Sequence, residues 1–153
     1  MENTFQCVVV APTGKVIDCK ASSVVFPAHD GMVGVLCDHM AMFCELGLGM
    51  MEVEYAPEAA DKSQTGRAFL VIDRGFALIG ENLMTIIAND TVSSTDAKKE
   101  KIERMIGHLE KKISSAEYTP DQQQHETKKI TLLKQLLAVS VSNPLETAVK
   151  STD

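Results

Sequence analysis

Short apolar runs alternate with turn residues over the first 93 residues of this chain, a pattern typical of consecutive β-strands. Each run holds about five to seven residues, and glycine, proline or asparagine separates many of the runs from their neighbours. About nine or ten short strands at this spacing favour an all-β sandwich or flattened barrel. We expect strands over residues 5–11, 15–20, 22–26, 32–36, 42–46, 49–55, 67–73, 76–79 and 83–89.

The hydrophobic period changes near residue 93, and after it the pattern becomes helical. Ser94 or Thr95 can cap the start of a first helix, and Asp96 favours its positive end. Five apolar residues then recur at steps of three and four, namely Ile102, Met105, Ile106, Leu109 and Ile113. Such a stripe covers one side of a helix and has to pack against another element.

A second helix is predicted to begin at Pro120, because Thr119 and Gln122 form the two ends of a capping box. Asn143-Pro144 should end this helix. The short connection between the two helices predicts an antiparallel helical hairpin. The apolar face of the second helix carries Ile130, Leu133, Leu137 and Val141, with Leu132 and Leu136 beside them.

These patterns divide the chain into a β-sandwich domain of residues 1–93, a helical hairpin of residues 94–142 and a disordered tail of residues 143–153. A hairpin of two helices cannot bury a wide apolar face by itself, so Leu132 and Leu136 require another surface. That surface is either the sandwich or another protein. We therefore expect the hairpin to be a movable element.

The net charge of −6 is unevenly distributed. Residues 1–93 hold five basic and twelve acidic side chains, a net charge of −7, whereas residues 94–142 hold nine and seven, a net charge of +2. The acidic part repels phosphate backbones, which argues against nucleic acid, and the basic part suits an acidic protein surface. No apolar run approaches the ~20 residues that cross a bilayer. We expect no signal peptide, and four free thiols from the scattered cysteines.

The sequence predicts no cofactor, no metal site and no active site. It lacks a glycine loop that leads into a helix, and its four histidines lie far apart. Cys37, Asp38 and His39 have the chemistry of nucleophile, acid and base, but neighbours on an extended segment point to opposite faces. His39 is better interpreted as a structural residue whose ring bonds to the loop backbone. A small hydrolase that uses Cys37 or His39 stays an alternative.

Two segments together resemble the epsilon subunit of F-type ATP synthases, which is called delta in mitochondria. The first segment matches a Pro-x-x-x-Gly-x-x-Gly-Ile/Val-Leu-x-x-His signature with Pro27, Gly31, Gly34, Val35, Leu36 and His39. The second matches a Gly-Gly-Phe/Ile turn and a Val-Thr-Val-Leu-Ala strand with residues 74–79 and 83–88. Cys37-Asp38, Met40-Ala41 and Arg74 depart from the family pattern, which indicates a divergent branch. The resemblance covers residues 4–116 and implies a non-catalytic rotor subunit.

The resemblance implies that the sandwich joins the gamma subunit to the polar loops of the membrane c-ring. At the matching positions, the loop that faces the c-ring contains His29, Asp30, Gly31, Met32 and Asp38, and Pro27, Gly34 and His39 shape it. Met32 stands at a usually acidic position, which favours an adaptable apolar contact. The protein is expected to be peripheral to the membrane, on the cytoplasmic face of the bacterial inner membrane, and not inserted in it.

The resemblance also implies that the helices inhibit ATP hydrolysis when they extend toward the catalytic alpha/beta hexamer. Lys128, Lys129 and Lys134 are candidates to meet acidic residues of the beta subunit, and a solvated helix face is the simpler interpretation. The ATP-binding motif of some bacterial relatives is altered, because Lys99 replaces arginine and Glu100 replaces alanine, so no nucleotide is predicted. The alternative function is an adaptor of another protein complex.

Overall fold

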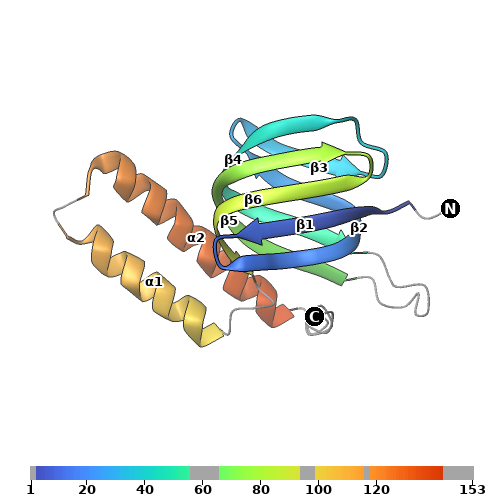
Figure 1. Ribbon diagram of the computed structural model, residues 1–153. Coiled ribbons are helices and arrows are strands. Elements are labelled where there is room, and N and C mark those ends of the chain that lie inside the picture. The colour runs from blue at the N-terminus through green and yellow to red at the C-terminus, as the bar shows by residue number, and fades with distance from the viewer. Residues whose placement is uncertain (1–2, 56–65, 94–98, 116–117, 143–153) are drawn as a thin grey trace.

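The computed structural model describes residues 3–55, 66–93, 99–115 and 118–142. These residues form a β-rich N-terminal domain followed by two helices, as predicted (Figure 1). The elements are β1 (Phe5–Ala11), β2 (Gly14–Ala28), β3 (Gly31–Leu36), β4 (Met42–Tyr55), β5 (Gly66–Gly80), β6 (Leu83–Ser93), α1 (Lys99–Ile113) and α2 (Pro120–Ser142). The strand order is β1-β6-β5-β4-β2-β3, and because β1 also pairs with β2, five strands close into a barrel that carries β3 beside β2.

The described residues contain six long strands in place of the predicted nine or ten, because three pairs of predicted strands are continuous. The glycine signals inside β4 and β5 were expected to separate strands. In the structure, β5 keeps its antiparallel pairing with β4 and with β6 on both sides of Arg74-Gly75. The ladder hydrogen bonds continue through this point, so the chain bends there and does not reverse.

The bend in β5 is built from two residues in left-handed conformations. Arg74 has φ 56° and Gly75 has φ 137°. Gly75 has to be glycine, because a Cβ atom there would lie 2.0 Å from the carbonyl oxygen of Ile87. Before the bend the buried interior residues of β5 are Leu70 and Ile72, and after it they are Ala77 and Ile79. The bend therefore changes which alternate positions point into the barrel.

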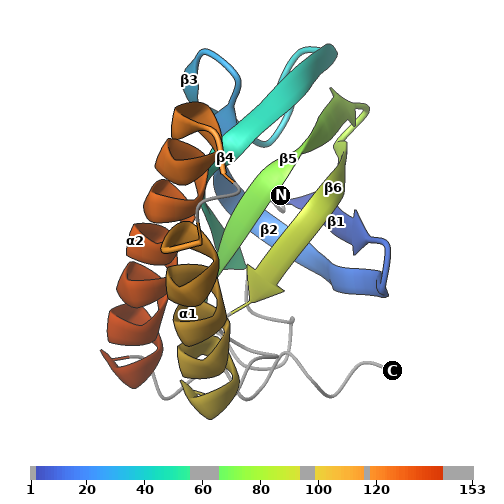
Figure 2. The same ribbon diagram turned by 90° about the vertical axis from the view of Figure 1, so that its left-hand side faces the viewer.

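The helices lie side by side against one side of the barrel and run in opposite directions (Figures 1 and 2). The capping box of α2 is confirmed, since the Thr119 amide donates to Gln122 Oε1 at 3.1 Å and the Gln122 amide to Thr119 Oγ1 at 3.4 Å. Neither helix, among the described residues, is long and apolar enough to span a membrane. The predicted caps at residues 94 and 95, the predicted tail and the side chain of Val141 lie outside the described residues.

Two hydrophobic cores result from this arrangement. The first fills the barrel with alternate residues from all six strands, among them Cys7 and Val9 of β1. The second lies between the helices and the outside of the barrel and includes Ile102 of α1 and Leu133 of α2. Leu136 is fully buried in this second core. The extra surface that Leu136 was predicted to need is thus the barrel itself.

Candidate interaction surfaces

The tip of the β2–β3 hairpin holds four of the five residues predicted to face the c-ring. Ala28 pairs with Gly31, which leaves His29 and Asp30 as a two-residue loop. The His29 amide donates to the Glu45 carbonyl oxygen at 2.9 Å and so ties the loop to β4. Met32 follows at the start of β3 and is 58% exposed. The tip therefore presents one apolar side chain beside a polar loop.

Asp38, the fifth predicted residue, lies at the opposite end of β3. The six residues of β3 separate it from the tip, about 20 Å at 3.3 Å per strand residue. Its amide donates to Asn82 Oδ1 at 2.7 Å, and Asn82 Nδ2 donates to Asp38 Oδ1 at 2.9 Å. Both residues have positive φ, 61° and 56°. Asp38 thus joins the β3–β4 connection to the β5–β6 turn and takes no part in the tip.

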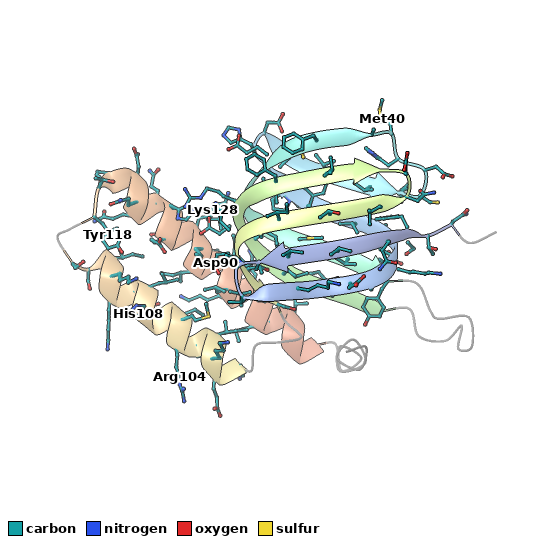
Figure 3. All side chains as sticks on the ribbon, viewed as in Figure 1. Met40, Asp90, Arg104, His108, Tyr118 and Lys128 are labelled. Carbon is teal, nitrogen blue, oxygen red and sulfur yellow. The ribbon has the colours of Figure 1, made fainter. Side chains whose placement is uncertain are left out.

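The residues predicted to shape the loop are also spread along the hairpin. Pro27 pairs with Met32 inside β2–β3, and Gly34 pairs with Val25 in the middle of it. His39 lies beyond β3, and its Nδ1 atom is 2.8 Å from the carbonyl oxygen of Met40. In Figure 3 Met40 projects from the corner of the barrel that is remote from the helices. The signature residues therefore form a strand pair and its two ends, not a single loop.

Cys37 and His39 do not form a nucleophile–base pair. The Cys37 Sγ atom lies 3.5 Å from the Thr4 carbonyl oxygen and 3.7 Å from Asn82 Oδ1, whereas the His39 ring faces the backbone at Met40. A catalytic thiol would require a base within hydrogen-bond reach. Within the described residues no three His, Cys, Asp or Glu side chains gather closely enough to hold a metal ion.

Four large apolar side chains are exposed together on the outside of β4, β5 and β6. Phe43 is 67% exposed, Phe76 49%, Leu78 57% and Ile87 57%. The strand register sets Phe43 opposite Leu78 and Phe76 opposite Ile87, which makes them neighbours across three strands. The two phenylalanine rings stack with centroids 5.5 Å apart. We call these four residues the open face. Clustered exposed apolar residues of this kind mark interaction sites.

Sequence reasoning missed the open face, although a signal for it was present. Residues 76–79 are apolar at every position, and residues 83–88 are nearly so. A strand with one side in water alternates apolar and polar residues, whereas a strand covered on both sides is apolar throughout. The absence of alternation therefore indicated a second covering surface for these strands.

A group of charged side chains joins α2 to the barrel, and we call it the ionic cluster. It comprises Asp73 and Arg74 of β5, Asp90 of β6, and His125, Glu126 and Lys129 of α2. Lys129 Nζ lies 3.2 Å from Asp73 Oδ2 and 2.8 Å from Asp90 Oδ2. Figure 3 shows Asp90 at the edge of the barrel next to α2. The cluster spans β5, β6 and α2, so it fixes the position of α2 on the barrel.

Burial and pairing act in opposite directions on the charged groups of this cluster. Burial favours the neutral form of Asp73, but the nearby Lys129 ammonium and His125 ring lower the pKa of this carboxyl overall. Burial likewise opposes the charge on Lys129, yet Asp90 and Asp73 raise the pKa of this amine overall. Both groups therefore stay charged at neutral pH and hold each other across the contact between helix and barrel.

Only part of the predicted lysine set is available on the surface of α2. Lys129 is held in the ionic cluster, with 12% of its side chain exposed. Lys134 lies 3.8 Å from Glu110 of α1, and both side chains are more than half exposed. Lys128 is exposed. In this arrangement Lys129 could contact another chain only after leaving Asp73 and Asp90.

The chain matches the family model described as "ATP synthase, Delta/Epsilon chain, beta-sandwich domain" over residues 4–94. It belongs to this family. The chloroplastic ATP synthase epsilon chain of Panax ginseng is 25% identical to it over 114 residues, which are 74% of this chain and 76% of the relative. The epsilon chain of Latilactobacillus sakei is 24% identical over 138 residues, 90% of this chain and 92% of the relative.

A solved structure shares the fold. A chain of the Euglena gracilis mitochondrial ATP synthase, determined by cryo-EM as OSCP/F1/c-ring in rotational state 1, superposes with a TM-score of 0.61 and 17% identity. The match covers 91% of this chain and 82% of that one. As a delta/epsilon chain, the protein is a non-catalytic, peripheral subunit of the central stalk of an F-type ATP synthase.

Proposed function

We propose that the barrel couples the gamma subunit to the c-ring, and that the two helices restrain ATP hydrolysis. The open face is the observation that carries the gamma contact. Phe43, Phe76, Leu78 and Ile87 lie on three hydrogen-bonded strands, so a partner that covers them is attached to a continuous sheet. A closed barrel transmits torque with little internal slip, because its strands pair on both sides.

The β2–β3 tip is the proposed contact with the c-ring. Met32 is exposed beside the polar residues His29 and Asp30, and a methionine side chain adapts to an uneven partner surface. The Euglena neighbour comes from an assembly that contains a c-ring, which supports this partner. In a bacterium this contact would hold the protein on the cytoplasmic face of the inner membrane.

The proposed restraint of hydrolysis requires the helices to leave the barrel and extend toward the alpha/beta hexamer. Lys128 and Lys134 are exposed in the docked arrangement, and Lys129 becomes exposed when the ionic cluster opens. We expect that deleting residues 94–153 raises ATP hydrolysis by the assembled complex. An unchanged rate in a complex that still contains the truncated chain would contradict this restraint.

The gamma contact is tested by exchanging the stacked rings for polar side chains. Phe43→Ser with Phe76→Ser should weaken binding to purified gamma subunit by about 1,000-fold, since central aromatic residues contribute about 2 kcal/mol each to interfaces. Val25→Ser is the matched control, because Val25 is a 36% exposed apolar residue of β2 outside the open face. Equal gamma affinity in the two variants would refute the contact. An adaptor of another complex predicts that gamma and the c-ring both fail to bind the unaltered protein.

A further inference from the structure

His125 lies between two carboxylates on the side of α2 that faces the barrel. Its Nε2 atom is 3.0 Å from Asp73 Oδ1, and its Nδ1 atom is 3.6 Å from Glu126 Oε1. A neutral imidazole has a single N–H group, so one ring nitrogen would turn a lone pair toward a carboxylate. A protonated imidazole presents an N–H group to both carboxylates. The geometry therefore suits the charged ring.

The charges around His125 support the same conclusion. The barrel contributes Asp73, Arg74 and Asp90, and α2 contributes Glu126 and Lys129. These groups make three negative and two positive charges, so a neutral His125 leaves a net charge of −1 and a protonated one leaves zero. The Glu126 Oε2 atom is buried and has no hydrogen-bond partner among the described residues. An uncompensated negative charge in such a site is unfavourable.

The ion pair that α1 makes with α2 lies further along the helix pair. α1 pairs with α2 through Glu110 and Lys134, and Lys134 is nine residues beyond His125 on α2. At 1.5 Å per residue this separation is about 13 Å along the helix axis. This ion pair is more than half exposed and therefore screened by solvent.

We propose that the ionic cluster is a proton-operated latch, in which a charged His125 holds the first half of α2 on the barrel and a neutral His125 loosens it. The apolar contacts of Ile130, Leu133 and Leu136 follow directly after the cluster on α2 and keep the helix near the barrel in both states. The latch thus adjusts the strength and register of docking, the role for which buried ion pairs are best attested.

The pH range in which this latch operates follows from the chemistry of the side chains. Imidazoles are the side chains that ordinarily change charge between pH 5 and 8. Carboxyl, amino and guanidinium groups ordinarily titrate outside this range, so the rest of the cluster keeps its charge. Docking is therefore stronger at pH 6 and weaker at pH 8. Combined with the proposed restraint of hydrolysis, on which this consequence rests, alkaline conditions make it easier for the helices to leave the barrel.

Hydrogen exchange of the isolated full-length protein tests the latch without any other subunit, so its outcome is independent of the gamma and hydrolysis experiments. The measured quantity is the protection of α2 amides relative to β1 amides at pH 6 and pH 8, corrected for the intrinsic pH dependence of exchange. We expect this ratio to fall about threefold or more toward pH 8, the scale of a partly exposed ion pair. The change should disappear in His125→Gln.

His108→Gln is the matched control, since His108 is an exposed histidine of α1 outside the cluster. It should keep the pH response of the unaltered protein. Asp73→Asn should lower the protection of α2 at pH 6 and remove the pH response. A pH-independent ratio in the unaltered protein would overturn the latch, and so would a His125→Gln variant that still responds. Loss of the response in His108→Gln would overturn it as well, because the sensing group would then lie on α1.

Discussion

The outer surface of the barrel has two apolar faces on the same three strands, and only one of them is covered. On one side of the bend, the helices cover Leu48, Met50, Phe69, Val71 and Val92, which we call the covered face. On the other side, the open face leaves Phe43, Phe76, Leu78 and Ile87 between 49% and 67% exposed. The two faces thus have similar side chains on the same strands, and they differ only in whether the helices of this chain cover them.

This difference separates residues that stabilise the fold from residues that are available for assembly. A side chain of the covered face gains its burial on folding, so its truncation is measured in the isolated protein. A side chain of the open face gains burial only when another chain binds, so its truncation leaves the isolated protein nearly unchanged. The bend at Arg74-Gly75 separates the covered face from the open face, and the ionic cluster lies beside this bend.

The largest effect is expected where α2 meets the covered face. Leu136 is completely buried there, and Leu136→Ala should cost about 2–5 kcal/mol of helix docking, because it removes apolar contacts and leaves a cavity. Hydrogen exchange should show the loss in α2 amides while β1 amides keep their protection. Gln135→Ala, a change at an exposed neighbouring position, is the control. Equal protection in the two variants would mean that the covered face does not hold the helix.

The second effect concerns the bend between the faces. Gly75→Ala should destabilise the protein by about 2–3 kcal/mol, because alanine is strained at positive φ and its Cβ meets the Ile87 carbonyl oxygen. The control is Gly107→Ala in α1, where a Cβ atom meets nothing within 4 Å. That change should stabilise the helix by up to about 1 kcal/mol. Urea unfolding measures both, and a Gly75→Ala protein as stable as the original would show that the bend tolerates a side chain.

The sequence predicted the local features well because each has a local physical cause. The capping box at Thr119 and the stripe around Ile102 follow from spacings of three and four residues. Glycine in β5, by contrast, signals positive φ without saying whether the chain reverses or bends, so the strand count was too high.

The candidate site was harder to predict from the sequence, because it depends on pairing between residues that are far apart in the chain. Met32 and Asp38 are close in sequence, but an extended strand carries them to opposite ends of the hairpin. Asp73 and Lys129 lie 56 positions apart, and no local pattern relates them. Lys129, one of the three lysines predicted to contact a beta subunit, is therefore held between α2 and the barrel, a result that only tertiary structure supplies.

A smaller effect should appear when acid neutralises the ionic cluster. The pKa of Asp73 is lowered in the folded protein, so its stabilisation is complete above the ordinary aspartate pKa of about 4 and is lost as the pH falls through the lowered value. Asp73→Asn should lower the free energy of unfolding by about 1 kcal/mol at pH 7 and make that free energy less dependent on pH in the acid range. Urea unfolding between pH 3 and 7 measures this. Parallel curves for the two proteins would mean that other carboxyl groups control the acid response.

The smallest effect on the isolated protein is expected at the open face. Leu78→Asn should change the free energy of unfolding by less than about 0.5 kcal/mol, because the side chain is already 57% exposed and buries little on folding. The same change should weaken gamma binding, since it removes apolar area that only a partner covers. Urea unfolding and gamma titration on one sample separate the two properties. A large loss of stability would show that the open face supports the fold and would remove its distinction from the covered face.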